Sequence, residues 1–206
     1  MLAGNTGPST AGWFRKPVTS LSDLKGLRIR VTGLGAEVYK RLGATPMVVS
    51  PSETYVALER GTIDAAEFLA PSNDLPMGLH KIAPHLAYPG FNKPNGASEA
   101  IISAQAWRDL PEHLKAIVQA ACRAEHDRGL AEAEAANATA MKQLIMAGAQ
   151  PMSMPADILD QARRATSDIL QDIAARDALS GRIVASYLEA RGEGAPWRAM
   201  QGLMRI

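Results

Sequence analysis

The sequence contains few of the residues that mark a disulfide scaffold, a zinc site or a nucleic-acid surface. Cys122 is the only cysteine, so no disulfide framework can form within the chain, and its apolar helical position indicates a buried small side chain. The four histidines show no HExxH or similar spacing, and the cysteine has no CxxC partner, which argues against a zinc site. A formal net charge of +1 supplies no basic stripe for DNA or RNA.

Other absences concern membranes and catalysis. No apolar run approaches the roughly 20 residues that span a bilayer, and the opening MLAGNTGPST turns polar and glycine-rich at once, unlike a secretory signal. No GxSxG elbow offers a serine nucleophile. Gly33 and Gly35 are better interpreted as turn glycines than as a dinucleotide fingerprint, because Val38 stands where the third glycine would be. These patterns do not indicate an enzyme.

The strongest pattern that is present lies between Leu24 and Phe68. The composition around it, 47% hydrophobic and 21% charged, is typical of a globular protein. We expect five elements here: strands over residues 27–31, 45–49 and 63–69, and helices over 36–42 and 50–61. Their short connections predict a right-handed parallel βαβαβ unit. Such a unit binds ligands beyond the carboxyl ends of its strands.

A long helix is predicted after this unit, from Leu110 to about Ala147. Its length, on the order of 57 Å if it is straight, exceeds a small domain, so it should link two bodies. Its early apolar positions follow the helical period: Leu114, Ile117, Val118 and Ala121. The other expected elements are a helical turn over 20–26, mostly loop over 70–96 with a short helix near 77–82, strands over 98–103 and 150–154, and helices over 155–176 and 180–191.

Two places near expected strand ends carry candidate binding residues. Arg28 and Arg30 project from one face of the first strand, either as surface charges or, for Arg30 near the carboxyl end, as a guanidinium that binds a carboxylate bidentately. Glu67 and Phe68 interrupt the third apolar run. This break indicates either an edge strand with a solvated face or an acid that faces a cleft, where it would suit a cation or a substrate hydroxyl.

Several stretches together point to one family. They are GNTG (4–7) followed by GWF (12–14), LKGLRIRVTGLGAEVYKRLGATP (24–46), ETYVALERGTIDAAEF (53–68) and YPGFNKPNG (88–96). With these motifs the whole chain resembles the solute-binding proteins of TRAP transporters, the DctP-type family. It is most similar to the subgroup that binds 2-oxo and 2-hydroxy monocarboxylates such as pyruvate or lactate. The resemblance implies an α/β, type II periplasmic-binding-protein-like fold, with two domains around a cleft and a long helix that spans both.

The resemblance also implies how the chain is divided. Family members carry a secretion signal and most of a first domain before the GNTG segment, so this chain corresponds to their carboxyl-terminal part. We therefore expect residues 1–95 with 139–206 to form the second domain. Residues 96–138 would be a strand and a helix that belong to a largely absent first domain.

The resemblance assigns roles to individual residues. Arg30 matches the arginine that binds the substrate carboxylate, and Asn5 matches the asparagine of the GNTG turn, expected to hydrogen-bond substrate. In this subgroup a sodium or calcium ion bridges substrate and protein, and Glu67 matches its acidic ligand. Phe68 stands where relatives usually have tryptophan and would add a backbone carbonyl and a wall.

Two positions depart from the family pattern. Ser9 replaces an expected glutamine, and Lys93 replaces an acid, so both argue against the ion. One hypothesis is that Lys93 takes the place of the ion, pairs with Glu67 and binds the substrate's oxygen. The alternative is that Lys93 points into solvent from its loop.

The function that follows from the resemblance is transport without catalysis. The chain would be the periplasmic component that binds a small monocarboxylate and delivers it to the TRAP transporter membrane subunits, with no organic cofactor and no nucleic acid. A homodimer is a further expected partner state. The alternatives are a ligand-sensing domain of a regulator, an enzyme that uses the cleft, and a truncated fragment that binds nothing.

Overall fold

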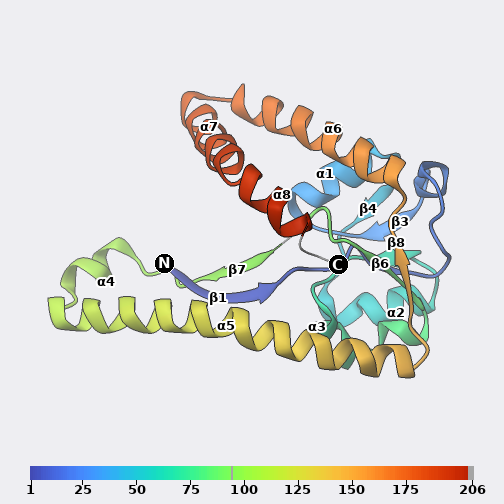
Figure 1. The fold of residues 1–206 in the computed structure, drawn as a ribbon, viewed down its shortest axis with the longest axis horizontal. Helices are drawn as coiled ribbons and strands as arrows, with labels where there is room; N and C mark the ends of the chain where they lie inside the picture. Colours follow the sequence, from blue (N-terminus) through green and yellow to red (C-terminus); the bar gives the residue numbers. More distant parts are fainter. Residues whose placement is uncertain (94, 204–206) are drawn as a thin grey trace. The chain divides into compact units, whose positions relative to one another are not determined.

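The chain forms two compact units. The computed structural model describes residues 1–93 and 95–203 (Figure 1), and the chain divides after Asp160. The first unit contains two sheets. The larger one has six strands in the spatial order β4 (Thr45–Met47), β3 (Arg28–Arg30), β5 (Ala65–Ala66), β2 (Gly12–Phe14), β6 (His85–Tyr88) and β8 (Gln150–Ser153).

The predicted parallel βαβαβ unit is confirmed at one end of this sheet. Strand β3 pairs in parallel with both β4 and β5. The connections are α1 (Gly33–Arg41), then a 3-10 turn (Pro51–Glu53) that continues into α2 (Thr54–Glu59). Gly43 and Gly61 follow these helices with φ values of 92° and 69°, which glycine adopts without the Cβ clash of other residues. The carboxyl ends of β3 and β5 therefore lie at the same edge.

The other half of the sheet differs from the expectation. Strand β2 pairs antiparallel with β5 and with β6, and β6 pairs in parallel with β8. Strand β2 lies before the first predicted element, and β6 lies in the stretch predicted as mostly loop. The third predicted strand is shortened to β5, because Leu69 leaves the ladder: its N–H donates to the Asp74 carboxylate at 3.2 Å and its carbonyl accepts from the Thr10 N–H at 3.0 Å.

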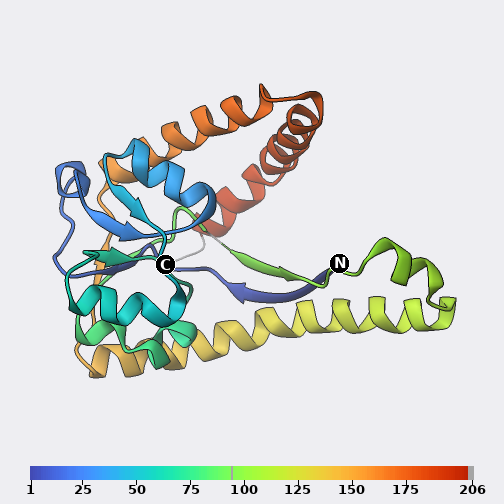
Figure 2. The ribbon, with the colours of Figure 1, turned by 180° about the vertical axis from the view of Figure 1, so that it is seen from behind.

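The long helix is confirmed as α5 (Glu112–Met146), 35 residues or about 52 Å long. The helix ends at Met146, close to the predicted end at about Ala147, and Gly148 follows with φ 98°. Beside α5 lies a two-stranded antiparallel ribbon of β1 (Leu2–Gly7) and β7 (Gly96–Glu99), as Figures 1 and 2 both show. The backbones approach closely at Gly129, where a Cβ would lie 3.1 Å from the Asn5 nitrogen. Strand β7 begins two residues before the predicted strand.

Two sequence patterns with the spacing of a capping box, Ser50 with Glu53 and Asp109 with Glu112, do not form one. Before α5, residues Ala104–Asp109 form a separate helix, α4, and the Asp109 carboxylate accepts from Gln105 Nε2 at 2.8 Å within that helix instead of capping the next one. Before α2, the Ser50 hydroxyl donates to the Glu53 carboxylate at 2.6 Å, so neither side chain bonds the backbone of the first turn. In both places a side-chain partner displaces the backbone partner.

The core of the first unit lies between the sheet and the carboxyl-terminal end of α5. Its fully buried members are Trp13, Leu58, Ile63, Leu79, Leu86 and Leu144. Each large apolar side chain buried in this way contributes about 1.5–3 kcal/mol. Cys122 is also buried, as expected, and is a free thiol. The sheet is thus a rigid base for residues at its strand ends.

The rest of the first unit is made of short elements. Helix α3 (Pro71–Asp74) and the 3-10 turns Leu75–Met77 and Leu79–Lys81 follow β5, and another 3-10 turn, Leu21–Leu24, precedes β3. The Ser72 N–H and hydroxyl both donate to Asn137 Oδ1, at 3.0 and 2.7 Å, and join α3 to α5.

The second unit is helical. Helix α6 (Ala156–Ala174) starts in the first unit, and α7 (Ala178–Glu193) and α8 (Ala195–Leu203) follow. Asp177 caps α7 by accepting from the Ser180 N–H at 2.8 Å. The helices α6 and α7 confirm the prediction, and α8 is additional. Among the described helices, none is both long enough and apolar enough to cross a membrane.

Candidate ligand-binding site

Arg30 is the last residue of β3, and its guanidinium is buried and anchored. Nη1 donates to the Glu67 carbonyl at 2.7 Å and Nε donates to the Val49 carbonyl at 3.3 Å. The guanidinium carbon lies 5.1 Å from the centre of the Phe68 ring. A guanidinium has five N–H donors, so these two bonds leave three for an acceptor placed beyond the strand ends.

Arg28, on the same face of the same strand, is a surface charge, which was the alternative considered for both arginines. It is half exposed, and its Nε and Nη2 bind the Asp64 carboxylate at 2.8 and 2.6 Å. The hydrogen bond from Arg28 lowers the pKa of Asp64 below its usual value. Arg28 is therefore a neutralised surface charge, whereas Arg30 is only 8% exposed and is bonded to carbonyl groups that carry no net charge.

Glu67 and Lys93 form an ion pair at the same edge. Lys93 Nζ lies 2.9 Å from Glu67 Oε1 and donates to the Phe68 carbonyl at 2.8 Å. Glu67 is only 2% exposed. The approach to Oε1 is not aligned as a hydrogen bond, so this buried oxygen has no hydrogen-bond partner among the described residues. The pairing predicted for Lys93 is confirmed, and the solvent-facing alternative is wrong.

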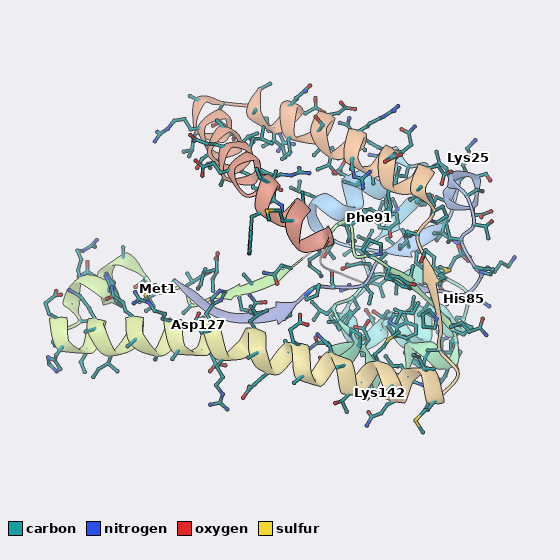
Figure 3. All side chains as sticks on the ribbon, in the orientation of Figure 1. Met1, Lys25, His85, Phe91, Asp127 and Lys142 are labelled. Carbon is teal, nitrogen blue, oxygen red and sulfur yellow. The ribbon has the colours of Figure 1, made fainter. Side chains whose placement is uncertain are left out.

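The loop that carries Lys93 is fixed to the rest of the unit at three points. The Ser9 hydroxyl donates to the Lys93 carbonyl. Gly90 lies so close to Ser9 that a Cβ would come within 2.2 Å of its carbonyl oxygen. Phe91, labelled in Figure 3, packs against Tyr39 of α1 with ring centres 5.4 Å apart. Ser9 thus contributes to the site by positioning the lysine.

A buried acid behind the site was missed by the sequence reasoning. Asp74 accepts from Trp13 Nε1 at 2.8 Å and from the Leu69 N–H at 3.2 Å. Burial raises its pKa to about 6, although the bond from Trp13 acts in the opposite direction. Asp74 therefore fixes the chain directly after Glu67 and Phe68. No local pattern marks it, because its partners are five and 61 residues away.

Asn5 is bonded elsewhere in the structure. Its side-chain oxygen accepts from the Gly7 N–H at 2.8 Å and shapes the end of β1. A contact between Asn5 and substrate remains a prediction.

The residues expected to hold an ion do not fit one as they stand. In the described part of the chain, no three His, Cys, Asp or Glu side chains gather as a metal group. Glu67 Oε1 and the Phe68 carbonyl, the two expected ligands, both lie within 3 Å of the Lys93 ammonium. A positive charge already stands between the two oxygens.

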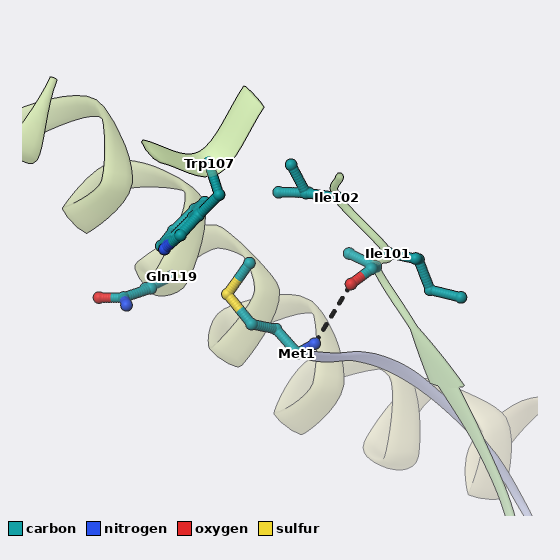
Figure 4. Close-up of a pocket in the computed structure, with 6 residues that line it drawn as sticks. Met1, Ile101, Ile102, Trp107 and Gln119 are labelled. Atoms are coloured by element: carbon teal, nitrogen blue, oxygen red, sulfur yellow. Dashed lines mark hydrogen bonds between the residues drawn. The ribbon is translucent and has the colours of Figure 1, made fainter. Parts of the chain in front are cut away.

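A hollow in the same unit is separate from this cluster. It measures about 430 Å³ and is lined by Met1, Ala100, Ile101, Ile102, Trp107 and Gln119. Figure 4 shows the bond from the amino terminus to the Ala100 carbonyl, 3.2 Å, at its side. The hollow shares no lining residue with the Arg30, Glu67 and Lys93 cluster, so it is not the candidate site.

Comparison with known families identifies the chain. The DctP family, described as bacterial extracellular solute-binding protein family 7, matches residues 1–177. The chain belongs to this family. Its α/β fold matches that of solved TRAP solute-binding proteins in the DctP family, which confirms the predicted fold class.

Three DctP relatives are particularly similar. A monocarboxylate 2-oxoacid-binding periplasmic protein from Nostoc is 33% identical over 201 residues, 98% of this chain and 55% of its own length. A protein from Colwellia psychrerythraea, solved with calcium and pyruvate, is 32% identical with a TM-score of 0.92, over 99% of this chain and 62% of its own. One from Bordetella bronchiseptica, a dimer solved with calcium and picolinate in one site, is 31% identical with a TM-score of 0.93, over 98% and 61%.

These relatives are longer than the chain, which spans between 55% and 62% of their lengths. A further solved relative, from Pseudoalteromonas atlantica, holds pyruvate with sodium in place of calcium. Calcium and sodium differ in charge. The Colwellia and Pseudoalteromonas proteins therefore share pyruvate and a small oxygen-binding cation, and not one particular metal.

Proposed function

We propose that this chain is the ligand-binding part of a periplasmic TRAP-transporter protein that binds a small 2-oxo or 2-hydroxy monocarboxylate and catalyses no reaction. The observation that carries the proposal is the buried Arg30, the last residue of β3, which has three N–H donors still available. A carboxylate accepts two of these donors side by side, and such charge-assisted bonds are about twice as strong as neutral ones.

The ion pairs of the cluster favour a ligand with one carboxylate. The charge on Lys93 is paired with Glu67, whereas the two recorded bonds of the Arg30 guanidinium go to uncharged carbonyl groups. Arg30 can pair with one carboxylate, and no second unpaired cation of the cluster is left for another. The Phe68 ring beside Arg30 supplies an apolar wall for a short carbon chain. Pyruvate and 2-oxoacids, the ligands of these relatives, have this chemistry.

The proposal also covers Asn5, the two lobes and the protein partners. Asn5 would bind substrate from the β1 side. Residues 1–95 with 139–206 would form one lobe, and residues 96–138 would pack with a further lobe that closes the cleft. The TRAP membrane subunits would receive the ligand from the closed form, and a homodimer is the proposed assembly. The names of the periplasmic relatives support the compartment.

The test is ligand binding by calorimetry on the chain and on a chimera in which residues 1–206 replace the matching part of the Nostoc relative. The panel is pyruvate, 2-oxobutyrate, lactate, acetate and succinate. We expect the chimera to bind the first three more tightly than acetate and succinate. Binding by the chimera but not by the chain would mean that the second lobe is required. If a well-folded chimera binds succinate best, or binds no carboxylate, the proposed function is wrong.

A further inference from the structure

The position of the Lys93 ammonium carries an inference beyond this function. The ammonium lies 2.9 Å from a carboxylate oxygen of Glu67 and 2.8 Å from the Phe68 carbonyl. Two oxygens arranged around one positive centre in this way form part of a site for a hard cation, which takes carboxylate and carbonyl ligands. The solved neighbours from Colwellia and Pseudoalteromonas hold calcium or sodium together with pyruvate.

The lysine is held at this place by the fold. Its carbonyl accepts from the Ser9 hydroxyl, and Gly90 of the same loop lies directly against Ser9. The side chain is about one-third exposed, while its partner Glu67 is only 2% exposed. Swinging Lys93 into water would leave the Glu67 carboxylate buried without a counter-charge, which costs more than an exposed pair is worth.

We propose that the Lys93 ammonium takes the place of a bound cation, so that ligand binding in this protein needs neither calcium nor sodium. An ammonium has three N–H donors. One binds the Phe68 carbonyl, while the charge of the ammonium pairs with Glu67 without an aligned hydrogen bond, so a further donor is available for the 2-oxo or 2-hydroxy oxygen of the ligand. Lys93 is thereby the residue that distinguishes a 2-oxo acid from a plain carboxylate. This last step rests on the proposed function, whereas the exclusion of the metal ion does not.

The first experiment needs no organic ligand. Calcium is titrated calorimetrically into the parent chain, Lys93→Gln, Lys93→Arg and the control Lys16→Gln, which changes an exposed lysine in a loop. We expect heat only with Lys93→Gln, because it removes the ammonium and offers an amide oxygen beside Glu67 and the Phe68 carbonyl. Lys93→Arg keeps the positive charge and should bind no calcium. If Lys93→Gln folds only in the presence of calcium, this dependence also demonstrates that the variant has gained a calcium site.

The second experiment repeats the pyruvate titration of the chimera in chelator and in calcium. Affinity of the parent should not change between the two. Lys93→Gln should lose at least about tenfold in chelator, as expected for a lost charged hydrogen bond, and should recover in calcium. The proposal is overturned if the parent binds calcium, if chelator abolishes its pyruvate binding, or if Lys93→Gln gains no calcium affinity. If the chimera binds no carboxylate, the proposed function fails while the calcium titration still decides the place of the lysine.

Discussion

At the scale of single residues, Arg30 and Arg28 form a natural matched pair. They lie two positions apart on one strand, but Arg30 is buried on carbonyl groups while Arg28 is neutralised by Asp64. In the chimera, Arg30→Lys keeps the charge and loses the planar fork, so pyruvate affinity should fall by about two to three powers of ten, or about 3–4 kcal/mol. Arg28→Lys should leave affinity unchanged. Calorimetry measures both, and equal affinities for the two variants would show that Arg30 does not bind the carboxylate.

Asp74 predicts how stability depends on pH. Its pKa in the folded chain is raised from 3.8 to about 6, mainly by burial. The folded state therefore holds a proton that the unfolded state has already lost, and Asp74 makes the chain less stable as pH rises through this window. A difference of about two pK units corresponds to about 3 kcal/mol.

The measurement is urea unfolding of the parent and of Asp74→Asn between about pH 4 and about pH 7. Over this range the free energy of unfolding of the parent should fall by about 3 kcal/mol more than that of the variant, because asparagine does not titrate. The variant should be less stable in absolute terms, since Trp13 and Leu69 donate to different oxygens of the carboxylate and asparagine replaces one of these oxygens with an NH₂ donor. Parallel pH profiles of the two proteins would contradict the role assigned to Asp74.

The sequence could predict those site residues whose signals are local, and not those whose partners are distant in sequence. Arg30 is recognisable because alternation and a strand end are local signals, and Glu67 because an acid breaks an apolar run. Asp74 is not, since its role depends on Trp13, whose strand pairing joins residues far apart in sequence. The pairing of Glu67 with Lys93 is predicted only through the family pattern, and its geometry needs the fold.

At the scale of elements, the segment that carries Lys93 depends on one close approach. A Cβ at Gly90 would lie 2.2 Å from the Ser9 carbonyl oxygen and 2.8 Å from its hydroxyl oxygen. Gly90→Ala should therefore push the loop away from Ser9, destabilise the first unit by about 1–3 kcal/mol, and weaken pyruvate binding by the chimera because Lys93 moves with the loop.

The control is Gly26→Ala. Gly26 has φ 72°, but the space around it is open, and a Cβ at this position would have no atom within 4 Å. The substitution should cost only the left-handed backbone penalty of about 1–2 kcal/mol, with ligand affinity unchanged. Unfolding by urea and calorimetry separate the two effects. If Gly90→Ala binds pyruvate as tightly as Gly26→Ala does, the loop does not position the site.

Sequence distance also decides which elements could be predicted. The βαβαβ unit is predicted correctly because each of its strands, helices and terminal glycines lies next to its partner along the chain. Strands β2 and β6 are missed because they are short, and their pairing joins residues 12–14 to residues 85–87. A three-residue strand with a glycine at one end shows no alternation long enough to detect.

At the scale of the whole molecule, the amino-terminal half of α5 exposes apolar side chains. Four positions of its predicted apolar stripe illustrate this: Leu114, Ile117 and Ala121 are exposed and Val118 is half-buried. Further on, Gly129 and His126 contact β1, and Leu144 enters the core. The predicted division, with residues 96–138 packed on another lobe, accounts for an apolar stripe at this place and stays a prediction.

This exposure predicts self-association of the 206-residue chain, because apolar patches in water are buried against whatever surface is available. Ile117→Lys should shift the chain toward monomer in sedimentation velocity. Val48→Lys is the control, since Val48 is 94% exposed in the segment after β4, outside α5, and it should leave the association unchanged. In the chimera, where a second lobe would cover the stripe, Ile117→Lys should instead reduce stability.

Hydrogen exchange adds an independent measure: amides of residues 112–121 should exchange faster in the chain than in the chimera. Strong protection of these amides in a monomeric chain would mean that α5 is stable without a covering lobe, and the predicted division at residues 96–138 would be wrong.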